Sequence, residues 1–283
     1  MRILIVGCGT IGKKVAQREL EAGSLVSGLS RSHTQDWPGQ TFHQFDLDSA
    51  EPLPMLEAPD VLYHFAPPLP KGTVDRRTTQ LLATLSSANI CPKRMILIST
   101  TGVYGNCHGD WVNETRPPNP QTDRARRRLS AEQQWQTFSD QQKIPLLILR
   151  VAGIYGPEKL PTARLQRGDP VLHQDQSPFS NRIHTDDLAM LCFTAGRQGK
   201  AGIYNATDGN PTTMTDFFYG VADTLEIKRP DEISMAQAKQ QLSHGMLSYL
   251  AESKRLSNDK ILTEFNVRLH YPTLQQGLKT INQ

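Results

Sequence analysis

The amino-acid sequence predicts an α/β protein with a doubly wound parallel sheet. Short apolar runs, of the kind that form strands buried on both faces, alternate with segments of helical period. A glycine-rich turn follows the first apolar run, and the length of 283 residues suits one large domain with an additional lobe. Repeated strand–helix–strand units of this kind form parallel sheets through right-handed crossovers.

Five apolar runs bounded by turn residues are the predicted strands, at residues 2–7, 24–29, 60–66, 94–100 and 145–156. Apolar residues at helical spacing from Ile11 to Leu20 predict an amphipathic helix between the first two strands. The group from Leu81 to Leu85 predicts another helix of the same kind. These elements account for the central layers of the predicted fold.

The pattern changes after Gly156-Pro157, where a polar, loop-like stretch begins. The segment "IHTDDLAMLCFTA" then predicts a helix, with Thr185 or Asp186 as its N-terminal cap, and "GIYNAT" predicts one more strand. The rest of the chain is mixed and mostly helical. We predict a core at residues 1–156, to which residues 182–208 return, and a smaller helical lobe formed by residues 157–181 and 209–283.

Composition bears on which partners the protein binds and on where in the cell it is expected. A net charge of +3 is too small to indicate nucleic acid or a membrane surface as a partner. The four cysteines are scattered without metal-ligand or paired spacing, which predicts free thiols and no metal site. We find neither a signal-peptide pattern nor an apolar run long enough to span a bilayer, so we expect a soluble, cytoplasmic protein.

The glycine turn "VGCGTIG" has the spacing G-x-G-x-x-G at Gly7, Gly9 and Gly12. The first glycine permits the tight turn, the second lets the backbone approach a pyrophosphate, and the third lets helix and strand pack closely. The N-terminus of the following helix favours the anion. The turn therefore predicts a Rossmann-type dinucleotide site, with Thr10 and Ile11 inside it.

The residues that end the second strand indicate which cofactor binds. NAD sites place Asp or Glu there, whereas this chain has Ser30, Arg31 and Ser32, with no carboxylate before Asp36. Arg31 can pair with a 2′-phosphate, and the two serines can donate hydrogen bonds. The sequence therefore predicts NADP as the preferred cofactor, with NAD as the alternative.

The segment "FDLD", at residues 45–48, contains two further candidate cofactor residues. Asp46 can contact the adenine amino group, with Leu47 beside the ring. The alternative interpretation of Asp46 is an ordinary loop cap.

Taken together, these motifs resemble the extended short-chain dehydrogenase/reductases, the group of NAD-dependent sugar epimerases and dehydratases. The resemblance runs nearly end to end, through "VGCGTIG", "LYHFAPP", "ISTTGVYG", "NETRPPNP", "LRVAGIYGP", "RIHTDDLA", "GIYNAT", "KRLSNDKI" and "YPTLQQGL". It implies that Phe65, Ala66 and Pro67 also line the cofactor site. It further implies a small-molecule substrate between core and lobe, and a homodimer formed through helices of the core.

The chain departs from this family at the residues that transfer the proton. The resemblance assigns a substrate-orienting hydroxyl to Thr100 and a helix position four residues after the catalytic Lys to Glu132. Counting back from Glu132 gives Arg128 for the family's Lys and Arg124 for its Tyr. An arginine stays protonated, so Arg124 can bind an anion but cannot act as a general acid–base. Arg128 can still replace the Lys electrostatically.

Other interpretations of these residues stay open. Tyr104 and Tyr155 lie near the ends of adjacent predicted strands, so either could supply the phenol, although both also fit a structural role. The arginine run from 124 to 128 could be a solvated helix face or, less readily, a nucleic-acid surface. His184 fits a packing or capping role better than that of a base.

These patterns predict an NADP(H)-binding, epimerase/dehydratase-like protein that acts on a small polar substrate, with a nucleotide sugar as one candidate. The proposed catalytic group comprises Thr100, Arg124, Arg128 and Tyr104. The rival hypothesis is a non-catalytic protein that binds NADP(H) as a sensor or as a partner of another protein. The missing Tyr favours this rival, and both hypotheses require the cofactor site.

Overall fold

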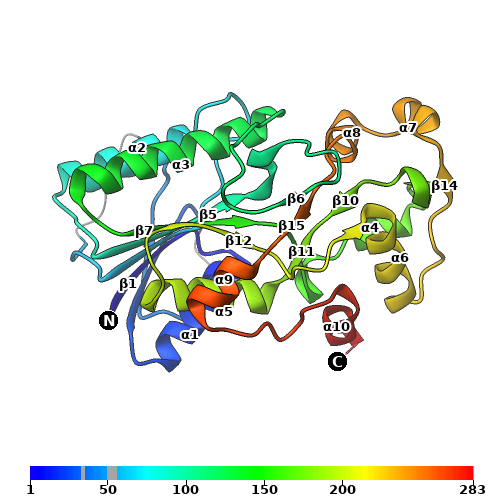
Figure 1. Ribbon diagram of the computed structural model, residues 1–283. Helices are drawn as coiled ribbons and strands as arrows, with labels where there is room; N and C mark the ends of the chain where they lie inside the picture. The colour runs from blue at the N-terminus through cyan, green and yellow to red at the C-terminus, as the bar shows by residue number, and fades with distance from the viewer. Residues whose placement is uncertain (33–35, 50–55, 283) are drawn as a thin grey trace.

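A seven-stranded, fully parallel sheet forms the centre of the computed structural model, which describes residues 1–32, 36–49 and 56–282 (Figure 1). Its strands, in spatial order, are β12 (Gly202–Ala206), β7 (Leu146–Val151), β5 (Arg94–Thr100), β4 (Val61–His64), β1 (Arg2–Val6), β2 (Leu25–Ser30) and β3 (Thr41–Gln44). All neighbouring pairs run parallel, which confirms the predicted doubly wound α/β fold class.

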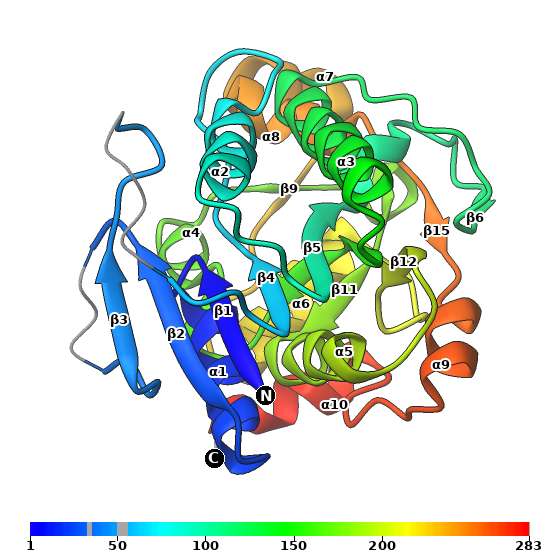
Figure 2. The ribbon, with the colours of Figure 1, turned by 90° about the vertical axis from the view of Figure 1, so that its left-hand side faces the viewer.

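Helices cover both faces of the sheet. Figure 2 shows α2 (Arg76–Ser87) and α3 (Asp123–Gln142) on one face, with α1 (Thr10–Glu21) and α5 (Thr185–Arg197) on the other. Side chains alternate along each strand, so β1 contributes to both cores. Ile3 and Ile5 pack with Val15 under α1, whereas Leu4 and Val6 belong to the core that contains Trp135 of α3.

The strand order reverses between β1 and β4, because the chain proceeds outwards to β2 and β3 and then returns to β4. In parallel sheets the crevice at such a switch point, beside the carboxyl ends of the strands, is the usual position of a ligand. The loop after β1 carries the glycine turn, so the fold places the predicted cofactor motif at this crevice.

The lobe lies to one side of the sheet, beyond the carboxyl ends of the strands (Figure 1). Its helices are α4 (Thr162–Gln166), α6 (Met214–Thr224), α7 (Met235–Gln241), α8 (His244–Leu250) and α10 (Leu274–Leu278). Short strand pairs link these segments: β9 (Val171–Leu172) with β14 (Glu232–Ile233), and β10 (Phe179–Ser180) with β13 (Thr212–Thr213).

Two further short strand pairs are present. β6 (Trp111–Val112) pairs with β15 (Arg255–Leu256) and connects the predicted core and lobe segments. β8 (Gly153–Tyr155) pairs with β11 (Arg182–His184) and joins two segments of the predicted core. The predicted division of the chain at residues 156, 182 and 208 stays a prediction. One helix of the predicted lobe segment, α9 (Asp259–Phe265), packs against β12 and α5 of the core.

A buried ion pair joins α3 to the sheet. The Arg150 Nη2 atom of β7 lies 2.8 Å from Glu132 Oε2 of α3, and the two side chains are 2% and 4% exposed. Ser99 of β5 donates to the other carboxylate oxygen, so both oxygens have partners. A buried pair of this kind fixes the position of a helix because separating its members leaves an unpaired buried charge. The pair therefore fixes α3, which carries Arg124 and Arg128, against β5 and β7.

No helix in the described part of the chain is long and apolar enough to cross a membrane.

Candidate cofactor and substrate site

A cleft of about 340 Å³ opens at the carboxyl ends of β1, β2 and β4. The predicted residues that line it are Gly7, Gly9, Thr10, Ile11, Gly12, Ser30, Arg31, Leu47, Phe65, Ala66 and Pro67. Four separate sequence segments therefore meet in one cleft, as a dinucleotide site requires.

The three positions of the turn require or permit glycine for different structural reasons. Gly7 has φ +100°, and an added Cβ would lie 2.5 Å from the backbone nitrogen of Ala66. At Gly12 an added Cβ would lie 2.4 Å from the carbonyl oxygen of Gly7. At Gly9 no heavy atom of the described residues lies within 4 Å of that position. The protein backbone thus requires Gly7 and Gly12, whereas Gly9 leaves space that opens into the cleft.

Two predicted cofactor residues, Ser32 and Asp46, do not belong to the described lining of this cleft. Asp46 is exposed, and its Oδ1 atom accepts a hydrogen bond from the backbone nitrogen of Asp48 at 3.0 Å. This is the loop-cap geometry that the sequence left open as an alternative. A contact between Asp46 and adenine stays a prediction.

The end of the cleft near β2 contains a charge cluster that the sequence did not reveal. Arg77, at the start of α2, lines the cleft and grips Asp48 with two hydrogen bonds, of which Nε to Oδ1 is 2.7 Å. This contact lowers the pKa of Asp48 below its ordinary value. The Arg31 guanidinium lies 4.0 Å from the same carboxylate. Arg77 is buried and fully engaged by Asp48, whereas the Arg31 side chain is 55% exposed beside the cleft and is the cation that a ligand can reach.

A second cavity, of about 570 Å³, continues from the cofactor cleft towards the lobe. Ile98, Arg128, Ile154 and Lys159 line both spaces, so the two cavities meet at these residues. Thr100, Arg124 and Arg128, three of the four predicted catalytic residues, line this second cavity. We refer to it as the substrate cavity.

The two arginines of α3 face this cavity, as the sequence predicted, but their partners differ. Arg124 Nη1 donates to Ser248 Oγ at 2.6 Å, and its guanidinium lies 3.9 Å from the centre of the Tyr249 ring. Both partners belong to α8 of the lobe. Arg128 donates to the carbonyl oxygen of Ile98 at 3.4 Å, and burial lowers its pKa. No carboxylate of the described residues forms an ion pair with either arginine.

Tyr104 and Tyr155, the two alternative phenols, are both buried, and neither belongs to the described lining of the cavities. Tyr104 donates to Asn205 Oδ1 at 2.8 Å, and burial raises its pKa. Tyr155 donates to the carbonyl oxygen of Thr273 at 3.4 Å, and burial also raises its pKa. Both hydroxyl groups thus have hydrogen-bond partners inside the protein. Tyr104 does not join Thr100, Arg124 and Arg128 in the described lining of the substrate cavity.

His184 takes the capping role that the sequence considered for it. Its Nδ1 atom accepts from the backbone nitrogen of Asp186 at 3.2 Å, so His184 is the cap of α5 in place of the predicted Thr185 or Asp186. The side chain is buried, and burial lowers its pKa. A buried cap with these contacts is a structural residue of the core.

Several polar residues of the substrate cavity come from the predicted lobe segments. They are Lys159, Ser180, Asn181, Tyr249, Glu252 and Lys254. With Arg124, Arg128 and Arg182 from the predicted core segments, the described lining holds five cationic side chains and one carboxylate, that of Glu252. The cavity is therefore strongly positive and suits an anionic ligand.

The model of the NAD dependent epimerase/dehydratase family matches residues 3–206, which is more than half of the chain. The chain belongs to this family. The matched range begins at β1 and ends at β12, so it covers the whole central sheet and the glycine turn. The family therefore accounts for the cofactor cleft and for the core side of the substrate cavity.

Two mammalian enzymes are similar to part of this chain. Human and bovine dTDP-D-glucose 4,6-dehydratases are each 26% identical over 122 residues, or 40% of this chain. The match spans 35% of the human protein and 34% of the bovine one, so the chain matches only about a third of their length.

Solved structures resemble this one along nearly the whole chain. A conserved protein of unknown function from Silicibacter pomeroyi has a TM-score of 0.85 and 27% identity, with 99% of this chain and 98% of that one covered. UDP-glucose 4-epimerase from Thermotoga maritima, in complex with UDP-glucose, has a TM-score of 0.79, 21% identity and coverage of 99% and 97%. dTDP-glucose 4,6-dehydratase from Bacillus anthracis, in complex with NAD, has a TM-score of 0.75, 20% identity and coverage of 100% and 96%. At 21% and 20% identity, the likeness to the epimerase and the dehydratase shows a shared fold.

Proposed function

We propose that this protein binds NADP(H) and acts on a small, polar, anionic substrate with the chemistry of epimerases and dehydratases. The observation that carries this proposal is the continuity of the two cavities, which share Arg128 and Ile154 at their junction. A nicotinamide ring that reached this junction from the glycine turn would face a ligand in contact with Thr100. In a dehydrogenase-type site the two reactants must meet in this way.

The residues of the cleft fit a dinucleotide. Gly9 leaves room for a pyrophosphate at the N-terminus of α1, where backbone N–H groups favour an anion. The exposed Arg31 side chain at the end of β2 supports a 2′-phosphate, and hence NADP. The family takes its name from NAD, and the B. anthracis relative was solved with NAD, so NAD is the alternative.

The lining of the substrate cavity supports a ligand that carries negative charge. Arg124 and Arg128 have no ion-pair partner among the described residues and are available to a phosphate or carboxylate. Thr100 accepts a hydrogen bond from the backbone nitrogen of Gly102 at 3.2 Å and keeps its own proton to donate. A nucleotide sugar meets both requirements, and the T. maritima relative binds UDP-glucose.

The second candidate function is a non-catalytic NADP(H) sensor. It is favoured by Arg124 at the position of the family's Tyr and by the buried positions of Tyr104 and Tyr155. Both candidates share the cofactor cleft, so only turnover separates them.

Calorimetric titration with NADP⁺ and NAD⁺, followed by assays with a panel of sugar nucleotides, tests the proposal. We expect NADP⁺ to bind about tenfold more tightly, since a charge-assisted contact contributes about 1.5–3 kcal/mol. Asp48→Asn removes the anion beside Arg31 and should increase this preference, whereas Asp36→Asn, an exposed aspartate paired with Lys13, is the charge-matched control. The proposed function would be disproved if the protein bound neither NADP⁺ nor NAD⁺. Binding without turnover of any sugar nucleotide would favour the sensor.

We also propose a homodimer formed through core helices and a cytoplasmic location. Light scattering on the purified protein tests the first, and fractionation of cells that express the full chain tests the second.

A further inference from the structure

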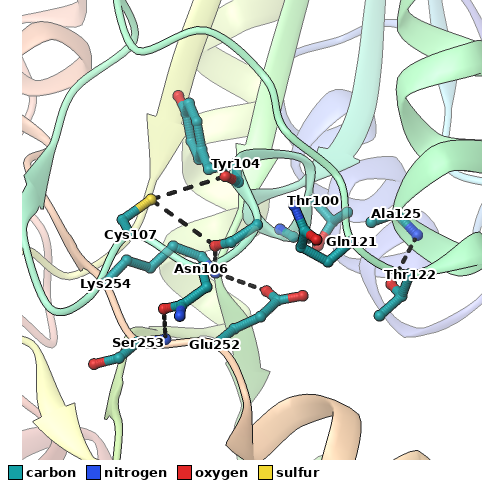
Figure 3. Close-up of polar contacts among 12 residues, drawn as sticks. Thr100, Tyr104, Asn106, Cys107, Gln121, Thr122, Ala125, Glu252, Ser253 and Lys254 are labelled. Atoms are coloured by element: carbon teal, nitrogen blue, oxygen red, sulfur yellow. Dashed lines mark hydrogen bonds and ion pairs between the residues drawn. The ribbon is translucent and has the colours of Figure 1, made fainter.

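A buried ion pair forms part of the wall of the substrate cavity on its lobe side. Lys254 Nζ donates to Glu252 Oε2 and to the carbonyl oxygen of Gly105, both at 2.8 Å (Figure 3). The side chains of Lys254 and Glu252 are 8% and 11% exposed, and both line the cavity. Lys254 is the first residue of the "KRLSNDKI" motif, but the sequence alone assigned a chemical role to neither Lys254 nor Glu252.

The pair is held to the core loop that follows β5. Ser253, between the two residues, donates its backbone N–H to Asn106 Oδ1 at 3.0 Å (Figure 3). Its carbonyl oxygen accepts from the backbone nitrogen of Cys107 at 3.1 Å. Gly105 has φ +68°, and an added Cβ would lie 2.1 Å from the carbonyl oxygen of Asn119. The loop is therefore built around a glycine, and the carbonyl that Lys254 contacts has a fixed direction.

One carboxylate oxygen of Glu252, the buried Oε1 atom, has no hydrogen-bond partner among the described residues. Ser180 Oγ and Arg182 Nε, from two other residues of the cavity lining, are also buried without such a partner in the described part of the chain. Buried polar atoms are normally hydrogen-bonded, and leaving one without a partner costs about 1–3 kcal/mol. The lining of one cavity thus contains an acceptor and two donors without partners, and the hydroxyl groups of a ligand could pair with groups of this kind.

Among the described residues that line the cavity, few can exchange a proton. The three arginines stay protonated, and the ammonium groups of Lys159 and Lys254 have no acceptor atom. Tyr249 is 52% exposed, and Arg124 covers one face of its ring. Glu252 is the one carboxylate of this described lining, and carboxylates serve widely as general bases.

We propose that Glu252 accepts a hydrogen bond, and during turnover the proton, from a hydroxyl group of the ligand in the substrate cavity. Lys254 is a positioning residue that holds the other carboxylate oxygen. In the oxidising direction the C–H and O–H bonds of the ligand's carbinol break and a C=O bond forms. The hydrogen from carbon leaves with its electron pair to oxidised NAD(P), and the hydroxyl proton moves to Glu252. The inference rests on the proposed function, which supplies the oxidant.

The test compares Glu252→Gln, which keeps the shape but cannot take the proton, with Glu252→Asp, which keeps the carboxylate. Glu21→Gln, at the exposed end of α1, is the control for net charge. Each variant is titrated calorimetrically with NADP⁺ and NAD⁺ and with two probes, UDP-glucose and UDP-glucuronic acid. Appearance of reduced nicotinamide is then followed under single-turnover conditions.

We expect Glu252→Gln to bind both cofactors as the wild type does and to bind the probes more weakly. Its rate of nicotinamide reduction should fall by about 10²–10⁴-fold, as expected for loss of a general base. Glu252→Asp should retain part of the rate and Glu21→Gln all of it. Lys254→Arg, which keeps the charge and the donors, should exceed Lys254→Met in rate at equal cofactor affinity.

Two other results have distinct meanings. Wild-type turnover that Glu252→Gln leaves unchanged would overturn the role of Glu252 and leave the proposed function intact. A wild type that binds cofactor but neither binds nor oxidises the probes would overturn the proposed sugar-nucleotide function, and the role of Glu252 with it.

Discussion

We expect Gly9→Val to abolish cofactor binding while the fold is kept. Gly9 precedes α1 with φ −76° and ψ −167°, a conformation that valine adopts readily. No heavy atom of the described residues lies within 4 Å of the added Cβ, so the side chain meets no protein atom there. Because Gly9 lines the cleft, the added carbons occupy the space that a pyrophosphate needs.

The size of the effect follows from the contacts that the pyrophosphate loses. A charge-assisted hydrogen bond from backbone N–H to phosphate contributes about 1.5–3 kcal/mol. Displacement that breaks two such bonds costs about 3–6 kcal/mol, which raises Kd by about 10²–10⁴-fold. The free energy of unfolding without cofactor should change by less than about 1 kcal/mol.

Thermal unfolding followed by circular dichroism, with and without NADP(H), measures both quantities, because a ligand that binds only the native state raises Tm. Gly12→Val is the matched control: its Cβ would lie 2.4 Å from the carbonyl oxygen of Gly7, so Tm should fall even without cofactor. If Gly9→Val keeps the full increase in Tm with NADP(H), then Gly9 does not face the pyrophosphate and the geometric argument is wrong.

Four further predictions follow from the structure. Arg31→Ala should remove most of the preference for NADP(H) over NAD(H), and equal Kd values already in the wild type would contradict it. Glu132→Ala should lower the free energy of unfolding in denaturant by about 3–5 kcal/mol, because Arg150 would remain buried without its partner; a loss below about 1 kcal/mol would contradict this. Arg124→Ala should weaken binding of UDP-glucuronic acid without changing the Kd of NADP(H), whereas Arg128→Ala should weaken NADP(H) as well, since Arg128 lines both cavities. Burial raises the pKa of Asp208 to about 7. The folded state therefore keeps a proton that the unfolded chain releases near pH 4, and this stabilisation, complete below about pH 4, is lost as the pH rises to about 7. The free energy of unfolding of Asp208→Asn should lack that component of the pH dependence.

Most of the central sheet was predictable because its strands are continuous apolar runs. Residues 94–100, for example, were predicted as a strand and form β5 (Arg94–Thr100). β3 (Thr41–Gln44) lacks such a run, since its sequence "TFHQ" forms a partly exposed edge strand. The two-residue strands of the lobe have no periodicity at all, and tertiary contacts alone define them.

In the candidate site, too, the features set by local sequence were predictable, and those set by tertiary contacts were not. The glycine turn was predictable because its three glycines act within one local turn, and Arg31 because it ends a strand beside that turn. Arg77 and Glu252 were missed, since their roles depend on contacts with Asp48 and Lys254 and on which cavity they line. Tyr104 was considered for catalysis from its place in "VYG", and burial of its hydroxyl against Asn205 could not be read from sequence.

Arg124, predicted from the resemblance to stand at the position of the family's Tyr, contacts the lobe. Arg124 extends from α3 to Ser248 and Tyr249 at the end of α8, so a core helix is bound to the lobe through a permanent cation. Glu252 follows α8 by two residues and faces the same cavity. If Glu252 exchanges the proton, both the cation that binds the ligand and the group that does the acid–base work depend on one lobe segment. Any displacement of α8 would then alter ligand binding and proton transfer together, whereas in a site built on a Tyr and Lys of α3 the core helix alone would hold both catalytic groups.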